Sequence, residues 1–291
     1  MDKKVAFLSM DKLENFHSYD SLLIEPMKKY GWIAEEVSWR NESVNWNDFD
    51  AVIVRSTWDY QLSSEKFLSV LENINNSSAH LENDLALMKW NMNKNYLLDL
   101  EKKGVQIVKT IWEESFNPAV VLEYFDKFNS EEIIIKPNIS ANADNAFRLT
   151  EEKFNEHLEE IERIFANKEF MVQPFMQNII EEGEYSLFYF NGEYSHSILK
   201  KPKHKDFRVQ EEHGGVIKAI NPTKEKILTA ENIIEKLPTI PLYARVDLVR
   251  TIVNDFALME LELIEPSLYF NLDEGSAERF TLNFLKKMSS Q

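Results

Sequence analysis

The sequence predicts a mixed fold in which an α/β region is joined to α+β regions, and three observations support this prediction. The chain has 291 residues, which exceeds the common size of one domain, so we expect two or three subdomains. Near the N-terminus, strand and helix patterns alternate as in a parallel α/β unit. Farther along, pairs of β-rich runs are separated by turn residues, which is typical of antiparallel hairpins.

The amino-acid composition and net charge exclude several classes of function. Hydrophobic residues make up 44% and charged residues 28%, as in soluble globular proteins. A net charge of −16 argues against a nucleic-acid or anionic membrane partner, and the absence of cysteine excludes disulfides, thiolate nucleophiles and cysteine-bound zinc. The apolar run Val5–Ser9 is too short for a signal peptide, and no run approaches the roughly 18 apolar residues of a membrane span. We therefore expect a cytoplasmic protein.

The N-terminal region is predicted to be a parallel α/β unit of about 80 residues. Val5–Ser9 and Ala51–Arg55 are β-rich runs, and a helical pattern lies between them ahead of Gly31. In such units ligands bind beyond the carboxyl ends of the strands, where the second run leads into Ser56–Tyr60. We predict a substrate pocket here, formed by Arg55, Ser56, Thr57 and Asp59. The alternative is a capped helix start with Trp58 and Tyr60 packed beneath it.

The middle of the chain is predicted to be α+β. A helical pattern covers Leu85–Lys103 and stops at Gly104, and Val105–Thr110 has the composition of a strand. The remaining elements are the helix Ala119–Phe128, the strand Ile133–Pro137, the loop Asn138–Asn145, the helix Glu151–Phe165 and the strand Phe170–Gln173. Neither GxGxxG nor GxxxxGK[ST] is present, so neither a Rossmann dinucleotide loop nor a P-loop is supported.

Lys136 is the residue of this middle section that is most indicative of a ligand site. It ends an isoleucine-rich strand just before Pro137 and a loop of small and polar residues. This position aims an ammonium group at whatever the loop covers, as a phosphate ligand would require. The alternative is a solvated lysine at the end of a strand.

A hairpin and a basic segment follow. Tyr185–Phe190 and Tyr194–Leu199 flank Asn191-Gly192, a strong two-residue turn signal. The next residues concentrate positive charge within an acidic protein, which indicates an anionic ligand; they are Lys200, Lys201, Lys203, Lys205 and Arg208. Helices are predicted over Lys224–Leu237 and Ser276–Met288.

Between these two helices, Arg245–Pro266 is predicted to be a hairpin that carries carboxylates. Alternation places Glu260 and Glu262 on one face, and a two-residue loop at Asn254-Asp255 would set Asp247 opposite Glu262. Opposed like charges destabilise a strand pair unless a cation joins them, and oxygen ligands on rigid strands suit Mg²⁺ or Mn²⁺. The alternative is an exposed acidic strand face.

Taken together, these motifs and their order resemble the ATP-grasp superfamily, specifically its glutathione synthetase and RimK-like branch of carboxylate–amine ligases. The resemblance implies an N-terminal α/β domain over residues 1–84, a linker helix and central lid subdomain over residues 85–175, and a C-terminal subdomain with the metal site over residues 176–291. The last two are α+β subdomains that would grip ATP between them.

The resemblance also assigns roles to individual residues. Lys94 and Lys136 resemble the family's two nucleotide-binding lysines, and Gln173-Pro174-Phe175-Met176 the linker that receives adenine. Further along, Glu184 resembles the ribose ligand, Arg208 the arginine that holds the phosphates or the acyl-phosphate, and Asp247, Glu260 and Glu262 the metal ligands. By the same resemblance Lys200 would bind the nucleotide, and Arg245 and Lys200 would orient the substrate carboxylate. Lys136, Arg208 and Arg245 would be the catalytic residues.

Two positions depart from the family pattern. The lid loop after Lys136 is normally glycine-rich so that its backbone can approach phosphate, yet residues 140–146 contain no glycine. The last metal position, often asparagine, is Glu262. The segments Ser56–Tyr60 and Leu261–Tyr269 are most similar to the subgroup that contains the cyclo-ligase of D-cycloserine biosynthesis.

The implied activity is an ATP-dependent ligation with Mg²⁺ or Mn²⁺. A carboxylate of a small amino-acid-like or peptide substrate would form an acyl-phosphate, and an amine would displace the phosphate to give an amide or lactam. The family resemblance also implies a homodimer. Two alternatives stay open: a nucleotide-binding module without turnover, suggested by the glycine-free loop, and a ligase that modifies the end of a peptide or protein.

Overall fold

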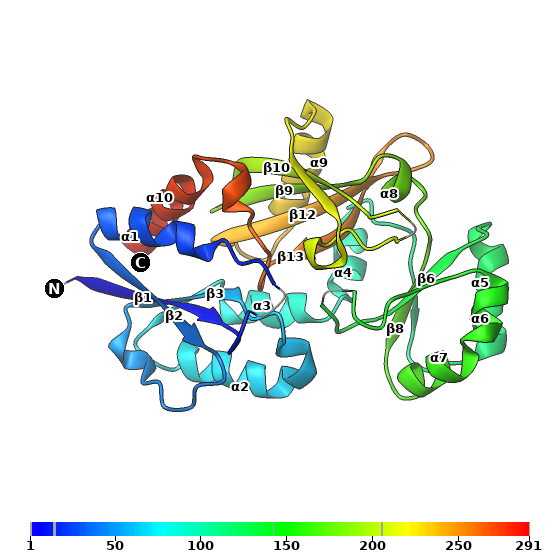
Figure 1. Cartoon of the computed structure of the whole chain (residues 1–291), viewed down its shortest axis with the longest axis horizontal. Coiled ribbons are helices and arrows are strands. Elements are labelled where there is room, and N and C mark those ends of the chain that lie inside the picture. Colours follow the sequence, from blue (N-terminus) through cyan, green and yellow to red (C-terminus); the bar gives the residue numbers. More distant parts are fainter. Residues whose placement is uncertain (1, 14–15, 142, 205, 291) are drawn as a thin grey trace.

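The computed structural model describes residues 2–13, 16–141, 143–204 and 206–290, and its strands form three sheets (Figure 1). The N-terminal sheet has the order β2-β1-β3-β4, the central sheet β5-β8-β6-β7 and the C-terminal sheet β11-β10-β9-β12-β13. The strands are β1 (Lys3–Ser9), β2 (Trp32–Ser38), β3 (Ala51–Ser56), β4 (His80–Glu82), β5 (Ile111–Glu113), β6 (Ile133–Pro137), β7 (Phe147–Leu149), β8 (Phe170–Pro174), β9 (Glu184–Phe190), β10 (Glu193–Lys201), β11 (Val216–Ala219), β12 (Tyr243–Arg250) and β13 (Phe256–Glu262).

Helices cover these sheets and connect them. The α-helices are α1 (Ile24–Lys29), α2 (Ser64–Asn75), α3 (Leu85–Met92), α4 (Tyr96–Lys102), α5 (Pro118–Phe128), α6 (Glu151–Glu156), α7 (Leu158–Phe165), α8 (Asn178–Glu181), α9 (Lys224–Glu235) and α10 (Ser276–Ser289). Short 3₁₀ helices are η1 (Asp20–Leu23), η2 (Trp46–Asp48), η3 (Tyr60–Ser63), η4 (Glu211–His213) and η5 (Phe270–Leu272). In the part of the chain that the structure describes, no helix combines the length and apolarity needed to cross a membrane.

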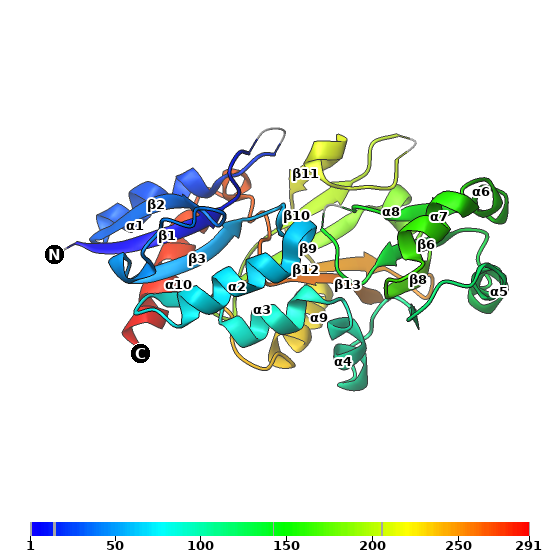
Figure 2. The same cartoon turned by 90° about the horizontal axis from the view of Figure 1, so that it is seen from below.

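The N-terminal sheet is parallel, as predicted, and is the middle of three layers. Because side chains alternate along a strand, Val5 and Phe7 of β1 pack on the side of α1 and α10, whereas Ala6 and Leu8 pack on the side of α2. Figures 1 and 2 show these helices on opposite faces of the sheet. The predicted strands fall within β1 and β3, while β2 and β4 were not predicted.

The C-terminal sheet is antiparallel and contains both predicted hairpins. The turn between β9 and β10 is confirmed, because Asn191 and Gly192 have φ angles of 49° and 79°. The central sheet comes before the C-terminal sheet in the sequence. Helices α5, α6 and α7 cover the central sheet and form a separate apolar cluster with it. Figure 1 places the C-terminal sheet between the other two.

The register predicted for the carboxylate hairpin is wrong. Arg250 pairs with Phe256, so the loop spans residues 251–255 and is not the two-residue turn Asn254-Asp255. A bulge then leaves Met259 without a partner on β12 and shifts the pairing. As a result Asp247 lies opposite Glu260, and Glu262 lies opposite Arg245, a cation. The pairing therefore sets one carboxylate against a positive charge.

Two predicted helices are divided. The pattern over residues 85–103 forms α3 and α4, which separate around Lys94, where the backbone N–H donates to the carbonyl of Asn138 at 2.8 Å. The pattern over residues 151–165 divides at His157 into α6 and α7. The predicted strand over residues 105–110 is not formed: Ile107 makes a single bridge to Leu258, and the edge strand of the central sheet is β5.

Candidate active site

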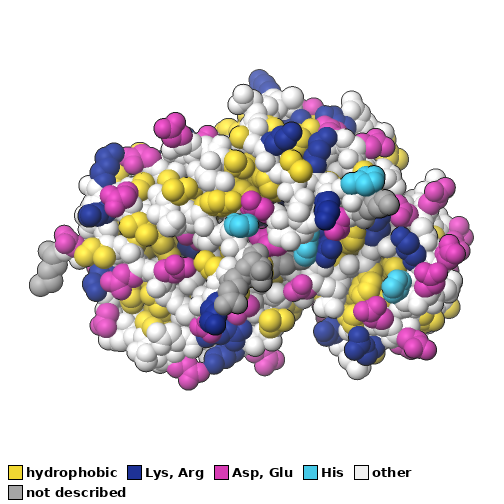
Figure 3. Space-filling view, in the orientation of Figure 1, with side chains coloured by type: hydrophobic (Ala, Val, Ile, Leu, Met, Phe, Trp, Pro, Cys, Tyr) yellow, Lys and Arg dark blue, Asp and Glu magenta, His cyan; other side chains and the backbone are white. Residues whose placement is uncertain are grey.

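A cavity lies where the three sheets approach one another. Its walls include Trp58 from the segment after β3, Lys136 from β6 and Glu260 from β13, and its empty volume is about 1490 Å³ with the open mouth included. Figure 3 shows this side of the molecule indented between the region of α2 and the lobe that carries α5, α6 and α7. Acidic and basic side chains are interspersed on the same face. A cleft between subdomains is a usual position for a ligand site.

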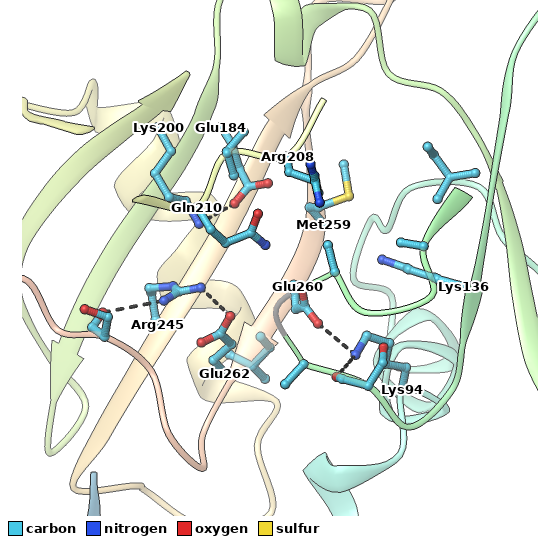
Figure 4. A pocket seen from close by; sticks show the side chains of 18 of the residues that line it. Lys94, Lys136, Glu184, Lys200, Arg208, Gln210, Arg245, Met259, Glu260 and Glu262 are labelled. Atoms are coloured by element: carbon cyan, nitrogen blue, oxygen red, sulfur yellow. Dashed lines mark hydrogen bonds and ion pairs between the residues drawn. The ribbon is translucent and has the colours of Figure 1, made fainter. Parts of the chain in front are cut away.

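Two lysines stand at the side of the cavity formed by the central sheet (Figure 4). Lys94 lies in the break between α3 and α4, and its ammonium contacts the carbonyl of Ser140 at 2.7 Å and a carboxylate oxygen of Glu260 at 3.1 Å. Lys136 projects from β6 into the same space. Burial lowers the pKa of Lys136, with Glu260 opposing the shift and Lys94 adding to it. An anion at this position would raise the pKa of Lys136 back toward its usual value.

The segment that leaves β8 forms an apolar wall beside these lysines. Gln173, Phe175 and Met176 all line the cavity. The amide of Gln173 is anchored by donating to the hydroxyl of Thr110 at 2.9 Å, and the guanidinium of Arg148 lies 3.7 Å from the centre of the Phe175 ring. Such a wall of flat and flexible apolar groups with fixed backbone suits an aromatic base.

A chain of charges crosses the C-terminal sheet at the floor of the cavity. Lys200 on β10 contacts Glu184 on β9 at 2.5 Å and Asp247 on β12 at 3.2 Å. Asp247 in turn contacts Arg245 at 2.9 Å and accepts a hydrogen bond from a serine hydroxyl at 2.5 Å. Arg245 closes the chain by binding Glu262 on β13, as Figure 4 shows. The sheet register produces this order, because these residues lie on adjacent strands.

The network fixes the charge state of its members. Burial opposes ionisation of Asp247, but Arg245 and Lys200 lower its pKa to about 2. Burial and Arg245 act against the charge of Lys200, yet the carboxylates of Asp247 and Glu184 raise its pKa to about 12. At neutral pH both groups are therefore charged, and each depends on the other for its stability in a buried position.

The three predicted metal ligands differ in their access to the cavity. Glu260 and Glu262 keep 31% and 28% of their side chains exposed, whereas Asp247 keeps 2%. Within the described ranges, the structure contains no group of three acidic or histidine side chains arranged to hold a metal ion. The oxygens of Glu260 and Glu262 are of the kind that Mg²⁺ prefers, and both face the cavity. Asp247 already has its bonds to Arg245, Lys200 and Ser186.

The loop that carries Arg208 forms another wall. Arg208 lines the cavity, and its guanidinium is held by two bonds to Asp206, at 2.8 Å and 3.1 Å. On the opposite side, Ser140, Ala141, Ala143 and Ala146 of the predicted lid loop line the cavity. Ala143 and Asn145 adopt positive φ angles of 57° and 55° without being glycine. Asn142 of this loop and Lys205 of the basic segment lie outside the described residues.

The predicted substrate residues have other contacts. Arg55 binds Asp20 at 2.9 Å and the carbonyl of Pro266 at 3.0 Å, and Asp59 binds the side chains of Trp39 and Arg40. Ser56 and Thr57 are fully buried, and none of the four predicted side chains lines the cavity. Trp58 and Tyr60 line it, although the alternative interpretation packed them beneath a helix start. The reason is that Trp58 Nε1 donates to the backbone oxygen of Glu265 at 2.8 Å, which turns this segment toward β13.

The residues of the cavity wall that were not predicted include Gln210, Glu265 and Tyr269. Glu265 follows β13, and burial together with Glu262 raises its pKa to about 8. Each of these residues lies outside a regular strand, so alternation gives no information about where its side chain points. Only the contact between segments distant in sequence brings them to the cavity.

Comparisons with known proteins place these features in a family. Residues 115–267 match the family model described as prokaryotic glutathione synthetase, ATP-grasp domain, and residues 5–83 match the N-terminal domain of D-cycloserine synthetase DcsG. The cycloserine biosynthesis protein DcsG of Streptomyces lavendulae is 27% identical over 273 residues, which cover 89% of this chain and 90% of that protein.

Solved structures agree on the fold. The crystal structure of D-cycloserine synthetase DcsG has a TM-score of 0.87 at 24% identity and covers 98% of this chain and 99% of its own. D-alanine–D-alanine ligase from Bacillus anthracis has a TM-score of 0.69 at 13% identity, with 100% of this chain and 98% of that chain covered. The ATP-grasp architecture implied by the sequence is thereby confirmed. Because the glutathione synthetase ATP-grasp model matches just over half of the residues, the chain belongs to this ATP-grasp family, and it is an ATP-dependent ligase.

Proposed function

We propose that this enzyme is a Mg²⁺-dependent carboxylate–amine ligase that acts on a small amino-acid-like substrate through an acyl-phosphate and releases ADP and phosphate. The observation that supports it best is the division of one cavity into two chemically different parts. Figure 4 shows Lys94 and Lys136 on one side of Glu260 and Arg245 on the other, and the aromatic residues Trp58, Tyr60 and Tyr269 are also part of the lining. Glu260 and Glu262 lie between the two ends, where a phosphoryl group would have to pass.

At the cationic end, three side chains would hold the phosphates of ATP. Lys94, Lys136 and Arg208 approach the cavity from three separate segments. Transfer of a phosphoryl group requires in-line positioning and neutralisation of the charge on its oxygens. Three preformed cations on different walls provide both without a large rearrangement. The base would lie against Phe175 and Met176, with Glu184 near the ribose.

Glu260 and Glu262 are the residues that would hold Mg²⁺, whose chemistry there is to neutralise phosphate oxygens. Both carboxylates now bind protein cations, Glu260 with Lys94 and Glu262 with Arg245. These ion pairs keep the carboxylates in place. We propose Asp247 as a third Mg²⁺ ligand. To bind the ion, its carboxylate would have to release part of its contacts with Arg245 and Lys200.

Arg245 and Lys200 would act on the substrate carboxylate in different ways. The guanidinium of Arg245 lies beside the cavity between Glu262 and the segment after β13, so it can bind a carboxylate directly. Lys200 is enclosed by Glu184 and Asp247 and would position these two acids. The attacking amine is a nucleophile once it is neutral, and the departing phosphate can accept the proton that the nitrogen loses as the amide forms.

Ring closure within one molecule is the second candidate. It is favoured by one observation, the similarity to the DcsG protein along nearly the whole chain, because that protein is named for cycloserine biosynthesis. A ligase that modifies a peptide remains a third possibility, since the ATP-grasp ligase PsnB, crystallised with its precursor, shares the fold at 14% identity and a TM-score of 0.68. We further propose a cytoplasmic location and a homodimer, as the family resemblance implies; light scattering would test the dimer.

The test is an ADP-release assay with ATP and Mg²⁺ against pooled amino acids and amino-acid analogues, with ATP binding measured by calorimetry. The proposal predicts ADP release that rises on addition of the substrate pool and a product whose mass shows loss of water. ATP binding without stimulation by any pool would contradict the ligase proposal and favour the binding module. Stimulation by peptides alone would move the assignment to a peptide ligase.

A further inference from the structure

One carboxylate of the cavity has no role in the function proposed above. Glu265 follows β13 and lines the cavity at the end formed by aromatic residues. Its backbone is fixed, because its carbonyl oxygen accepts the hydrogen bond from Trp58 Nε1 at 2.8 Å. Within residues 2–13, 16–141, 143–204 and 206–290, its carboxylate has no ion pair and no hydrogen bond to another residue, and only its own backbone N–H donates to it. The charge that acts on it most strongly is that of Glu262, another acid.

Tyr60 provides a second, independent observation at the same place. It begins η3, is 4% exposed and lines the cavity, yet its hydroxyl has no hydrogen-bond partner in the described part of the chain. This hydroxyl is not among the fully enclosed polar atoms and opens to the cavity, where a bound ligand can supply its hydrogen-bond partner. The charged side chain with the strongest effect on this hydroxyl is Glu265, followed by Glu262 and Glu260.

Among the described residues no cation forms an ion pair with Glu265, although the charge of Lys94 acts on it. Lys94 is bound to Glu260 and Ser140, and Arg245 is bound to Asp247 and Glu262. A carboxylate among other carboxylates, with aromatic faces at its side, is a site for a positively charged ligand. Mg²⁺ is assigned to Glu260 and Glu262, so the cation at Glu265 must belong to the substrate.

We propose that Glu265 and Tyr60 bind the α-ammonium group of an amino-acid substrate whose carboxylate lies toward Arg245. This inference rests on the ligase function proposed above and names the substrate class. Arg245 and Glu265 line the same cavity, and an α-amino acid carries one negative and one positive charge that a guanidinium and a carboxylate would bind. The bound ammonium is a recognition group that the ligation does not consume.

The test compares each α-amino acid with the α-hydroxy acid of the same skeleton, such as alanine with lactate and serine with glycerate, over both enantiomers of a full amino-acid panel. Hydroxylamine is supplied in every assay as the amine that displaces the phosphate. The two members of a pair differ only in the group that Glu265 would bind. Wild-type enzyme should prefer the amino acid. In Glu265→Gln the KM for the amino acid should rise roughly 10-fold to 100-fold, while kcat changes little and the KM for the hydroxy acid stays the same.

Two further variants separate recognition from general damage. Tyr60→Phe removes only the hydroxyl and should raise the same KM by about tenfold or less. Glu274→Gln removes an equal charge from an exposed position outside the cavity and should leave both KM values unchanged. Calorimetric titration of ATP should give the same Kd for all variants, which also shows that each is folded.

The outcomes distinguish this inference from the proposed function. If wild-type enzyme uses hydroxy acids as well as amino acids, or if Glu265→Gln affects both classes alike, the ligase stands and the ammonium site is wrong. If ATP binds but no amino acid stimulates ADP release, the proposed function fails for this substrate class, and the inference is overturned with it.

Discussion

At the scale of single residues, the cavity floor shows how one charge can be held in place by another. Glu260 lies on β13 with its carboxylate open to the cavity, while Lys94 holds it from the opposite wall. Asp247 is nearly inaccessible, and its carboxylate binds Lys200 and Arg245. The accessible carboxylate of Glu260 is therefore available to ligands. The inaccessible carboxylate of Asp247 holds the neighbouring cations in position.

Replacement of Glu260 by Gln tests the first task. The variant keeps the shape of the side chain but loses the charge, so ligation should fall by about 100-fold or more, as for other electrostatic groups at a reacting phosphate. Unfolding by urea should change little, because the side chain is partly exposed. Glu274→Gln, an exposed acid outside the cavity, is the control in the ADP-release assay. Turnover close to wild type in Glu260→Gln would remove this residue from the mechanism.

His196 gives a prediction for pH. It is buried on β10, stacked on Phe188 at 4.3 Å, and its Nε2 donates to the carbonyl of Leu268. Burial lowers its pKa to about 4, below the value of about 6.5 expected in the unfolded chain. The unfolded state therefore binds the proton first, so the contribution of His196 to stability is complete above pH 6.5 and is lost as the pH falls toward 4.

The expected loss from this residue is about 3 kcal/mol in the free energy of unfolding. Urea titrations at pH 7 and pH 4.5 would measure it, with His196→Gln for comparison. The variant should be less stable at pH 7 but should show a smaller drop on acidification. His157→Gln, at an exposed position, should keep the full drop of the wild type. An identical pH dependence in wild type and His196→Gln would contradict the assignment.

At the scale of elements, the loop between β10 and β11 is held by a close backbone approach at Gly215. A Cβ atom there would lie 2.1 Å from the carbonyl oxygen of Val209. The added methyl group would force the backbone of Val209 to move. Because Arg208 is the residue before Val209, we expect Gly215→Ala to displace Arg208 as well. We expect the KM for ATP to rise about tenfold or more in the ADP-release assay.

The matched control for this loop is Gly104→Ala. Gly104 has a φ angle of +85° and open space around its Cβ position, so alanine there costs about 1 kcal/mol of stability without moving a neighbour. The KM for ATP should stay at the wild-type value in this control. Equal KM changes in the two variants would show that lost stability, and not a displaced Arg208, is the cause.

Elements that depend on local signals could be predicted from the sequence. The hairpin at Asn191-Gly192 is one, because two residues with positive φ determine it. The hairpin of the carboxylates was predicted in the wrong register, because the bulge at Met259 is invisible to alternation. The break at Lys94 depends on a hydrogen bond to Asn138, which is distant in sequence. For the same reason the hydrogen bond from Trp58 to the backbone oxygen of Glu265 carried no signal in the sequence.

At the scale of the whole molecule, α10 connects the N-terminal sheet to the C-terminal sheet. Phe284 meets Trp32 of β2 edge to face at 4.8 Å, and Phe280 meets Phe190 of β9 at 5.2 Å. Figure 1 shows α10 beside α1, far in sequence from the elements that it covers. The position of Trp58 relative to Glu265 depends on how these two sheets are held, so the helix supports the cavity without lining it.

Phe284→Ala tests this connection. The side chain is fully buried, so its removal should lower the free energy of unfolding by about 3–5 kcal/mol, measured by urea titration. Leu282→Ala on the exposed side of the same helix should change it by about 0.5 kcal/mol or less. Since α10 belongs to one apolar cluster with both sheets, tryptophan fluorescence and circular dichroism should follow a single transition in wild type. Two separate transitions in the wild-type protein would mean that the sheets unfold independently and that α10 does not couple them.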